Sequence, residues 1–482
     1  MSDVFIDSLH EHKVFLASRR KHVLMITNHG IHQWKTFPGL PDTGGQNVYV
    51  NQFTGVLAQL GFKITIVNRG GYLHPFTGEW RRGLRYQDGQ QRILYLEDNI
   101  KKFVRKEDMH EQIPHLVESL RRFLNVEGTR VDVILSHYWD GAQVGLLYNR
   151  TLQGRVKHIW VPHSLGAIKK RNVSRDRWAG LRIDERMAIE QSLLEELDGI
   201  AATSSTVRRA LKEDYGYAGA VLFLPPGVDT DRFYPREVSD EDEIWDFLSQ
   251  RSGLSPEEVR SRKIVMEISR TDATKRKNVL LEAFAIARQR VPGSLLVVSI
   301  DDNQKNDDNQ SNLASELRGL IRSLDLQNHV AVVGSVWDIL PTLYAVTDVY
   351  CTPSVMEGFG MSAQEAAATG VPVVASHLVP FVTEYLSGEE LEVIHFEGGD
   401  QPFDRLRTRP VKWGRGAVVV QADDVNGFAY ALEMLLTDDD LREEMGRNAY
   451  HITVPYFTWQ NMVTAFLDEI GVSAGNVRGV HA

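Results

Sequence analysis

Short apolar runs alternate along this chain with longer segments whose apolar residues recur at helical spacing. Residues 22–28 are apolar and rich in β-favouring side chains, and residues 48–60 have the spacing of a helix. Gly61 ends that helix, and residues 63–68 are predicted to form the next strand. This stretch therefore predicts a β-α-β unit, which is typical of α/β domains with mostly parallel sheets.

The same alternation continues in two series, which predicts two Rossmann-like, doubly wound halves. In the first series we expect further strands at 92–96, 131–136, 158–161, 199–203 and 220–224. In the second series we expect strands at 264–268, 295–299, 330–333, 349–351, 371–375 and 417–420, with helices at 278–290 and 362–369. The fold class is therefore α/β, with two such halves facing a central cleft.

The junction between the halves is predicted within residues 225–262, which carry turn-forming Pro and Gly residues and then an acidic run. We expect an N-terminal domain over residues 1–235, joined by a C-terminal helix within 459–482, and a C-terminal domain over 236–458. The polar stretch 301–312 is expected to be a surface loop.

Composition narrows the classes of partner. The 482 residues are 43% hydrophobic and 24% charged, which is ordinary for a globular protein with ample core. A net charge of −10 argues against nucleic acid or an anionic membrane as the main partner. The single cysteine excludes an internal disulfide framework, and no apolar run is long enough for a membrane helix. We expect a cytoplasmic protein with a small-molecule ligand, whose oligomeric state the sequence leaves open.

Two candidate ligand-binding loops follow strands of the first half. Gly44, Gly45 and Gln46 precede a helix, where backbone amides favour an anion, although a tight turn explains two glycines equally well. His163 follows another strand, with Lys169 nearby as a cation for phosphate. The competing interpretation is that His163 only caps its turn.

The segment that contains Arg182, Arg186 and Glu190 has these residues four apart on one helical face. A surface ion pair between neighbours at this spacing is the default interpretation. Asp229 and Asp231 resemble a metal-binding pair, but they lie in a turn, and we reject that reading. We expect no metal site.

The second half offers a more specific set of residues. Residues 269–278 place four cations, Arg270 and those at 275–277, next to a helix N-terminus. Cations there oppose the helix dipole, and a bound diphosphate would offset that cost. Downstream, Glu357 precedes a glycine-rich turn and Glu365 lies one turn into the next helix. Two carboxylates can accept hydrogen bonds from sugar and ribose hydroxyls, while the backbone amides of the turn can bind a phosphate.

Together these residues resemble the retaining glycosyltransferases of family 4, which have the GT-B fold. The most specific part is E-G-F-G-x-x-x-x-E at 357–365, followed by G-V-P at 370–372. The N-terminal half is most similar to the sucrose-phosphate synthase branch of this family. The matching pieces are G-G-Q-x-V-Y-V at 44–50, the arginine Arg69, K-F-x-x-K-E at 102–107, H-Y-x-D-G at 137–141 and H-S-L-G-A-x-K at 163–169. Sucrose synthases and mannosylfructose-phosphate synthases share much of this pattern.

The resemblance implies a role for each matching residue. On the donor side it implies residues that bind the diphosphate, the sugar and the ribose, together with backbone contacts to the phosphate and the nucleobase. These donor-side residues are Gly45, Arg270, Lys275, Lys277, Val333, Gly334, Glu357, Phe359, Gly360, Met361 and Glu365. On the acceptor side it implies contacts to the sugar and its phosphate by Gly45, Gln46, Lys102, Lys106, Lys169 and Arg186. The catalytic set that it implies is His163, Arg270, Lys277 and Glu357.

The implied activity is that of a hexosyltransferase that moves glucose from UDP-glucose to fructose 6-phosphate with retention. In the family the donor phosphate helps to deprotonate the acceptor, and cationic side chains replace a divalent metal, so no cofactor beyond the nucleotide sugar is expected. GDP-mannose or ADP-glucose as donor, and fructose, phosphoglycerate or a glycosylglycerate as acceptor, remain alternatives. From other classes, a nucleotide-sugar epimerase and a silent nucleotide-sugar-binding subunit also remain open.

Two departures from the family pattern matter. Lys275 has the family's spacing from Arg270, whereas Lys277 has the family's following Asn278, so the diphosphate lysine is undecided. Residues 376–380 (S-H-L-V-P) stand where the family commonly has Gly-Gly-Pro.

Overall fold

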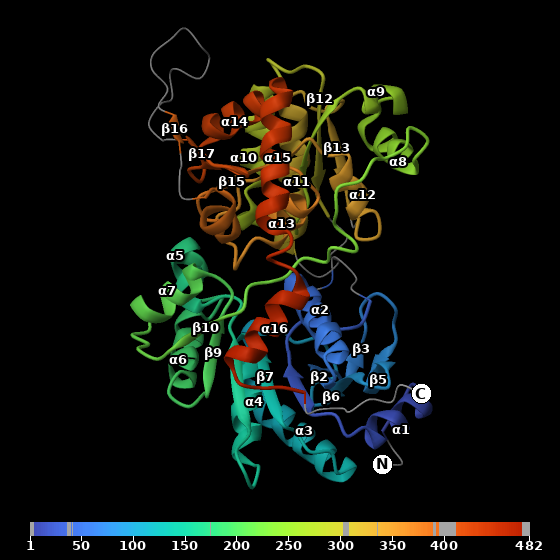
Figure 1. Ribbon diagram of the computed structural model, residues 1–482, viewed down its shortest axis with the longest axis vertical. Helices are drawn as coiled ribbons and strands as arrows, with labels where there is room; N and C mark the ends of the chain where they lie inside the picture. Colours follow the sequence, from blue (N-terminus) through green and yellow to red (C-terminus); the bar gives the residue numbers. More distant parts are fainter. Residues whose placement is uncertain are drawn as a thin grey trace. The chain divides into compact units, whose positions relative to one another are not determined.

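The computed structural model of the protein describes residues 4–35, 40, 42–173, 175–301, 308–334, 336–388, 392–394 and 411–474. The chain divides into two compact units: unit 1 contains Met1–Gly227 and Trp459–Ala482, and unit 2 contains Val228–Thr458. Each unit is built on its own eight-stranded, mostly parallel sheet (Figure 1). Among the residues just given, no helix combines the length and the apolar character that crossing a bilayer requires.

The sheet of unit 1 has the order β10-β9-β8-β7-β1-β2-β6-β5, in which β5 is antiparallel to β6. Its strands are β1 (His22–Ile26), β2 (Lys63–Arg69), β5 (Gly83–Asp88), β6 (Gln91–Leu96), β7 (Val133–His137), β8 (Lys157–Val161), β9 (Gly199–Ala202) and β10 (Val221–Phe223), with a small separate pair, β3 (Tyr72–Leu73) and β4 (Trp80–Arg81). Every residue of β1 and β2 is buried, because helices cover both faces of a parallel sheet.

Helices cover the two faces of this sheet with separate apolar clusters. The helices of unit 1 are α1 (Leu9–Ala17), α2 (Gly45–Gln59), η1 (Lys106–Gln112), α3 (Ile113–Glu127), α4 (Tyr138–Arg150), α5 (Gly166–Asn172), η2 (Arg175–Arg177), α6 (Ile183–Leu193), α7 (Ser205–Glu213) and α16 (Trp459–Glu469). One cluster joins the sheet to α3, α4, α6 and α7. The other joins it to α2 and α16, where Val463 and Phe466 pack with Phe53.

The sheet of unit 2 has the order β13-β12-β11-β14-β15-β18-β17-β16, and its last two strands are antiparallel. Its strands are β11 (Lys263–Glu267), β12 (Ser294–Ser299), β13 (Val330–Val333), β14 (Val349–Thr352), β15 (Val373–Ser376), β16 (Glu392–Ile394), β17 (Val411–Trp413) and β18 (Ala417–Val420). Its helices are α8 (Glu243–Ser252), α9 (Pro256–Arg260), η3 (Ala273–Lys275), α10 (Lys277–Ala287), α11 (Asp308–Ser323), α12 (Leu340–Ala345), α13 (Met361–Ala368), η4 (Val382–Leu386), α14 (Val425–Thr437) and α15 (Asp439–Thr453). Helices α10, α11 and α14 share one apolar cluster with the sheet.

The predicted α/β class and the parallel strands are confirmed, and three local expectations change. The junction contains two helices, α8 and α9, because Ile244 and Leu248 bury an apolar stripe that the surrounding charges obscure in the sequence. The structure groups residues 228–235 with unit 2, whereas we expected them in the N-terminal domain. Residues 308–312 of the expected loop lie in α11, and residues 302–307 lie outside the described residues.

Candidate active site

Each sheet reverses its strand order at one point, and ligands of open α/β sheets bind beyond the carboxyl ends of the strands at that point. In unit 1 the reversal lies between β1 and β7, and in unit 2 it lies between β11 and β14. The sequence-predicted residues gather at these two edges.

In unit 1 three residues near this edge have a left-handed backbone. Asp42, Tyr138 and His163 have φ angles of 50°, 64° and 55°. Tyr138 directly follows β7, and His163 follows β8. A bulky residue in this region is strained by roughly 1–3 kcal/mol, and such strain concentrates at functional sites. The backbone therefore marks the same edge that the motifs predicted.

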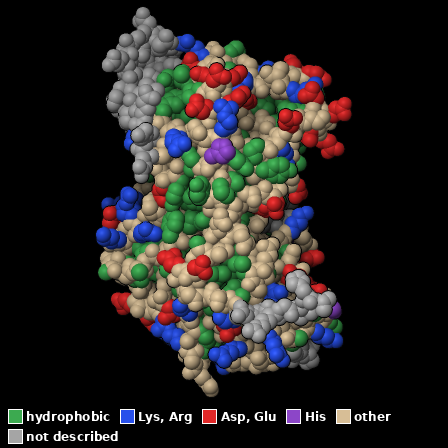
Figure 2. All heavy atoms as spheres, viewed as in Figure 1, with side chains coloured by type: hydrophobic (Ala, Val, Ile, Leu, Met, Phe, Trp, Pro, Cys, Tyr) green, Lys and Arg blue, Asp and Glu red, His purple; other side chains and the backbone are tan. Residues whose placement is uncertain are grey.

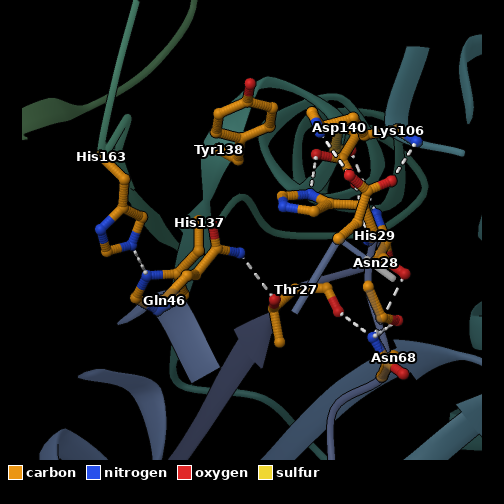
Figure 3. Close-up of polar contacts among 12 residues, drawn as sticks. Thr27, Asn28, His29, Gln46, Asn68, Lys106, His137, Tyr138, Asp140 and His163 are labelled. Atoms are coloured by element: carbon orange, nitrogen blue, oxygen red, sulfur yellow. Dashed lines mark hydrogen bonds and ion pairs between the residues drawn. The ribbon is translucent and has the colours of Figure 1, made fainter. Parts of the chain in front are cut away.

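Polar side chains connect the end of β1 to the helices that follow β1 and β7. The Gln46 side chain, in the first turn of α2, donates to Thr27 Oγ1 (2.8 Å). Asp140, in the first turn of α4, accepts the His29 backbone N–H (3.0 Å) and lies 2.9 Å from His29 Nδ1 (Figure 3). Gly45 is exposed at the start of α2. Gly45 and Gln46 therefore lie at the carboxyl edge, as expected for ligand-binding residues.

His163 is held by a second histidine. Its Nε2 lies 2.9 Å from Nδ1 of His137, the last residue of β7, and the two rings stack with an interplanar angle of 24° (Figure 3). Tyr49 of α2 contacts the His163 ring edge-on at 4.8 Å. Burial, with a smaller effect of His29, lowers the pKa of His163 to about 3, so its imidazole is neutral at pH 7.

A polar pocket in unit 1 contains three of the four cations predicted for the acceptor phosphate. Lys106, Lys169 and Arg186 line it, and the fourth cation, Lys102, is exposed and lies outside it. The remaining lining residues are Glu107, His110, Tyr138, Trp139, Leu181, Arg182, Glu185 and Ile189. The sequence thus predicted a set of cations that three distant segments bring together.

The three cations differ in how their charge is compensated. Lys106 forms an ion pair with Asp42, which raises the Lys106 pKa despite burial. Lys169 shares the carboxylate of Glu107 with Lys106, at 3.6 Å from both ammonium groups. Burial, helped by the neighbouring Lys106 charge, lowers the Lys169 pKa to about 8. Lys169 is therefore a cation with too little negative charge around it.

Each guanidinium nitrogen of Arg186 donates a hydrogen bond within the protein. Nε donates to Glu190 Oε1 (2.7 Å), Nη1 to the Tyr138 hydroxyl, and Nη2 to Ser164 O (2.7 Å). The guanidinium also lies over the Tyr138 ring at 4.3 Å. The Arg186–Glu190 pair exists as expected, but it is buried rather than on the surface, because Tyr138 and Ser164 enclose it. Arg186 thus fixes the wall of the pocket.

Lys102 lies outside the pocket because Arg69 holds its loop. The Arg69 guanidinium binds Asp98 through two hydrogen bonds (2.5 and 2.9 Å) and donates to the carbonyls of Ile100 and Lys102 (2.8 and 2.9 Å). The matching arginine of the motif is therefore a buried support for the 98–102 loop. The Lys102 side chain remains exposed.

In unit 2 the loop after β11 presents Arg270 and Lys275. Arg270 is exposed, and Asp272 holds the loop by accepting from Thr274 N (2.8 Å) and Thr274 Oγ1 (2.6 Å). Lys275 forms an ion pair with Glu357 of the loop after β14. Val355 N donates to Thr274 O (2.8 Å), so the two loops are joined. The structure thus brings Lys275 and Glu357 together.

Lys277 is placed differently from Lys275. Its side chain is 1% exposed, and its ammonium group bonds to Glu267, to Ser269 O (3.1 Å) and to Ser299 Oγ (3.1 Å). Burial lowers the pKa of Lys277, and Glu267 opposes that effect. All these partners are internal, so Lys277 holds the end of β11 against β12.

The glycine-rich turn leads into α13. Gly360 has φ 113°, and a Cβ there would meet Val379 Cγ1 at 2.6 Å, so the turn requires glycine. Phe359 is buried and Met361 begins α13, whose first backbone amides face the carboxyl edge. Glu365 lies on the same helix, with the Tyr344 hydroxyl 3.2 Å from its Oε2. Burial raises the Glu365 pKa to about 7.

The remaining predicted residues lie at the end of β13. Val333 is buried, and Gly334 is exposed with open space around its Cα. On the face drawn in Figure 2, acidic and basic side chains are interspersed. Within the described ranges, no group of three or more His, Cys, Asp or Glu side chains is arranged to hold a metal ion.

Sequence reasoning missed several pocket residues. Tyr138 and Glu107 were present in the quoted motifs, but nothing in the sequence assigned them to a pocket. Arg182 was interpreted only as a charge on a helix face. In the structure its own backbone is left-handed (φ 46°), and its guanidinium forms an ion pair with Glu185 at 2.6 Å. The sequence signal that could have identified Arg182 as a pocket residue is its position one helical turn before Arg186, immediately before α6.

Comparisons with known proteins agree with this arrangement. A model described as "Glycosyltransferase Family 4" matches residues 43–232, and one described as "Glycosyl transferases group 1" matches residues 255–401. The mannosylfructose-phosphate synthase of Agrobacterium fabrum is 27% identical over 460 residues, which cover 94% of this chain and 91% of that protein. A D-inositol 3-phosphate glycosyltransferase of Corynebacterium jeikeium is 27% identical and covers 88% of this chain and 90% of that protein.

Solved structures show the same fold. The sucrose-phosphate synthase of Thermosynechococcus elongatus has a TM-score of 0.74 at 22% identity, covering 94% of this chain and 98% of that chain. The Anabaena protein HepE in complex with UDP-glucose has a TM-score of 0.64 at 16% identity, covering 93% and 99%. The two family models together match more than half of the chain. The chain is therefore a glycosyltransferase with the GT-B fold, and it belongs to family 4.

Proposed function

We propose that this enzyme transfers glucose from UDP-glucose to fructose 6-phosphate with retention of the anomeric configuration. The observation that carries the proposal is the pocket of Lys106, Lys169 and Arg186. Lys169 has a pKa of about 8 because it is buried, with the neighbouring charge of Lys106 as a smaller cause. A phosphate dianion on the acceptor would supply the missing negative charge and bind both lysines as point charges.

The position of the pocket relative to His163 fits an acceptor sugar. Arg186 donates to the carbonyl of Ser164, the residue after His163. Tyr138 lines the pocket and directly follows His137, which bonds to His163. An acceptor with its phosphate among the lysines would therefore extend its sugar ring toward Gln46 and His163. The names of three relatives support a phosphorylated acceptor, since they contain sucrose-phosphate, mannosylfructose-phosphate and inositol 3-phosphate.

On the donor side we assign the diphosphate to Arg270 and Lys275. Lys277 is excluded from that role in the proposal because its ammonium group is buried among internal partners. Lys275 is paired with Glu357, and an arriving diphosphate would take over Lys275 and free Glu357 for the sugar hydroxyls. Glu365 would accept from the ribose, and the amides at the start of α13 would bind phosphate. The residues Val333 and Gly334 would contact the nucleobase.

The chemistry follows from this charge distribution. The bond between the anomeric carbon and the diphosphate oxygen breaks, and its electron pair stays on the diphosphate. The acceptor hydroxyl attacks the same face and gives its proton to the departing phosphate oxygen. Arg270, Lys275 and the backbone amides of the glycine-rich turn stabilise the developing negative charge, so we expect no divalent cation to be required.

A second candidate uses GDP-mannose as donor and the same phosphorylated acceptor. The similarity to mannosylfructose-phosphate synthase favours it. The two candidates share the acceptor pocket and differ only in the nucleotide sugar.

The test is a matrix of donors and acceptors, with product configuration determined by NMR and with parallel reactions in EDTA. We expect an α-linked product from UDP-glucose and fructose 6-phosphate, at a rate unchanged by EDTA. We also expect at least about tenfold lower kcat/KM with unphosphorylated fructose, the scale for losing a charge-assisted contact. A preference for the unphosphorylated acceptor, an inverted product or inactivation by EDTA would contradict the proposal.

A further inference from the structure

The geometry of the His137–His163 pair indicates which ring nitrogen of each histidine carries the proton. His137 is fully buried at the end of β7, and His163 follows the neighbouring parallel strand β8. One hydrogen bond of 2.9 Å joins His137 Nδ1 to His163 Nε2. Tyr49 lies edge-on to both rings, at 5.9 and 4.8 Å, and its hydroxyl is fixed on Leu224 O (3.2 Å). The rings therefore have little freedom to turn.

Both imidazoles are neutral, because burial lowers the pKa of His137 well below its usual range and that of His163 to about 3. Each ring then carries one proton, and the shared bond needs one donor and one acceptor. Two arrangements satisfy this. Either His137 Nδ1–H donates to His163, or His163 Nε2–H donates to His137.

The second nitrogen of His137 distinguishes the two arrangements. His137 Nε2 is buried and has no hydrogen-bond partner in the described part of the chain. If His163 were the donor, the His137 proton would sit on this nitrogen as a buried N–H without an acceptor. If His137 is the donor, Nε2 is a bare lone pair. Orphaned buried N–H groups are rarer and costlier than unsatisfied acceptors, so the arrangement in which His137 donates to His163 is favoured.

We infer that His137 donates to His163 and thereby fixes the His163 proton on Nδ1, which makes His163 a permanent hydrogen-bond donor to an oxygen of the reacting sugars. Figure 3 shows this nitrogen of His163 on the side of the ring away from His137. A ring with its proton locked on Nδ1 presents no basic nitrogen there. His163 therefore stabilises an oxygen lone pair rather than removing a proton, and His137 is a positioning residue.

The catalytic consequence of this inference rests on the proposed function. The tautomeric state of His163 itself can be measured without substrate. Long-range ¹H–¹⁵N spectra of the full chain with ¹⁵N-histidine, assigned with His163→Gln and His137→Asn, report which nitrogen carries the proton. We expect Nδ1–H on both His137 and His163. A proton on Nε2 of His163 overturns the inference, whatever the substrates prove to be.

The kinetic test uses two substitutions of equal shape. In His137→Asn the amide nitrogen replaces Nδ1 and still donates, whereas His137→Leu has no donor. We expect His137→Leu to lower kcat roughly 10- to 30-fold, the scale of one lost hydrogen bond, with KM values within about twofold. His137→Asn should stay within about threefold of wild type. Equal losses in both variants, or wild-type kcat in His137→Leu, would overturn the inference.

His158 provides a matched control. It is a fully buried histidine of β8 whose ring Nε2 lies 2.7 Å from Ser136 Oγ, and its other ring nitrogen also lacks a partner among the described residues. It lies in β8 before the carboxyl edge. His158→Leu should lower Tm and leave kcat per folded molecule unchanged. If no donor and acceptor pair gives transfer with wild-type enzyme, the proposed function fails, while the tautomer measurement still decides the inference.

Discussion

The two candidate sites follow the same topological rule and differ in how they hold charge. In unit 1 the cations are partly or fully enclosed, and Arg186 is bound by Glu190, Tyr138 and Ser164. In unit 2 Arg270 is exposed, and Lys275 forms an ion pair with Glu357. Unit 1 thus encloses its cations in a pocket, whereas the unit 2 loop has one exposed cation and one cation that forms an ion pair. The difference is consistent with the proposed function, in which the acceptor phosphate does not react and the donor diphosphate gains negative charge and leaves.

The largest expected effect separates the two lysines of the unit 2 loop. Lys277→Met would leave Glu267 buried without its partner, which costs about 3–5 kcal/mol of folding free energy. Thermal and urea unfolding would measure this loss. Lys275→Met, whose pair is partly exposed, should unfold nearly as wild type while losing turnover. A stable but inactive Lys277→Met enzyme would restore Lys277 as the diphosphate residue.

Arg270→Ala should lower kcat by on the order of 10²-fold or more, the effect of removing one preorganised donor to developing charge. Steady-state kinetics at saturating donor and acceptor would measure it. Arg276→Ala is the matched control, since Arg276 lies in the same loop and pairs with Asp423 at the surface. Similar losses in both variants would show that the loop needs general positive charge rather than Arg270.

The acceptor pocket should lose affinity as pH rises. Lys169 has a pKa of about 8, so its charge is present below pH 7 and lost above pH 9, and bound phosphate would raise that pKa. We expect the KM for the phosphorylated acceptor to increase roughly tenfold between pH 7 and pH 9, the free energy of one pKa unit. Lys169→Met should raise KM at pH 7 and remove this dependence. A pH-independent KM in the wild type would contradict the pocket assignment.

The smallest effect concerns Glu365, whose pKa is raised to about 7. Its carboxylate form increases from pH 6 to pH 8, and ribose hydroxyls donate more strongly to a carboxylate than to a carboxylic acid. Calorimetry should therefore show UDP affinity increasing by up to about tenfold over this range. Glu365→Gln should flatten the curve. Without nucleotide, the raised pKa means that its contribution to stability is present below pH 4.5 and lost as pH rises through 7.

The parallel strands were predictable because they are short runs in which apolar residues predominate, as in β1 (H-V-L-M-I) and β13 (V-A-V-V). The antiparallel edge strands were not, since β5 (G-L-R-Y-Q-D) mixes charged and polar residues with apolar ones and lies at the edge of the sheet, paired with β6. At the site, the motifs located Lys275, Glu357 and the pocket lysines. They did not separate Lys275 from Lys277, because the distinction depends on Glu267, which a sequence pattern does not connect to Lys277.

The return of α16 to unit 1 has a consequence for synthesis of the chain. Trp459, Val463 and Phe466 complete the apolar face over Tyr49 and Phe53, yet the ribosome makes them only after all of unit 2. At ordinary translation speeds, unit 1 waits roughly 10 to 50 seconds with that face uncovered. Nascent unit 1 is therefore a natural client for a chaperone, and a chain that stops before residue 459 should aggregate.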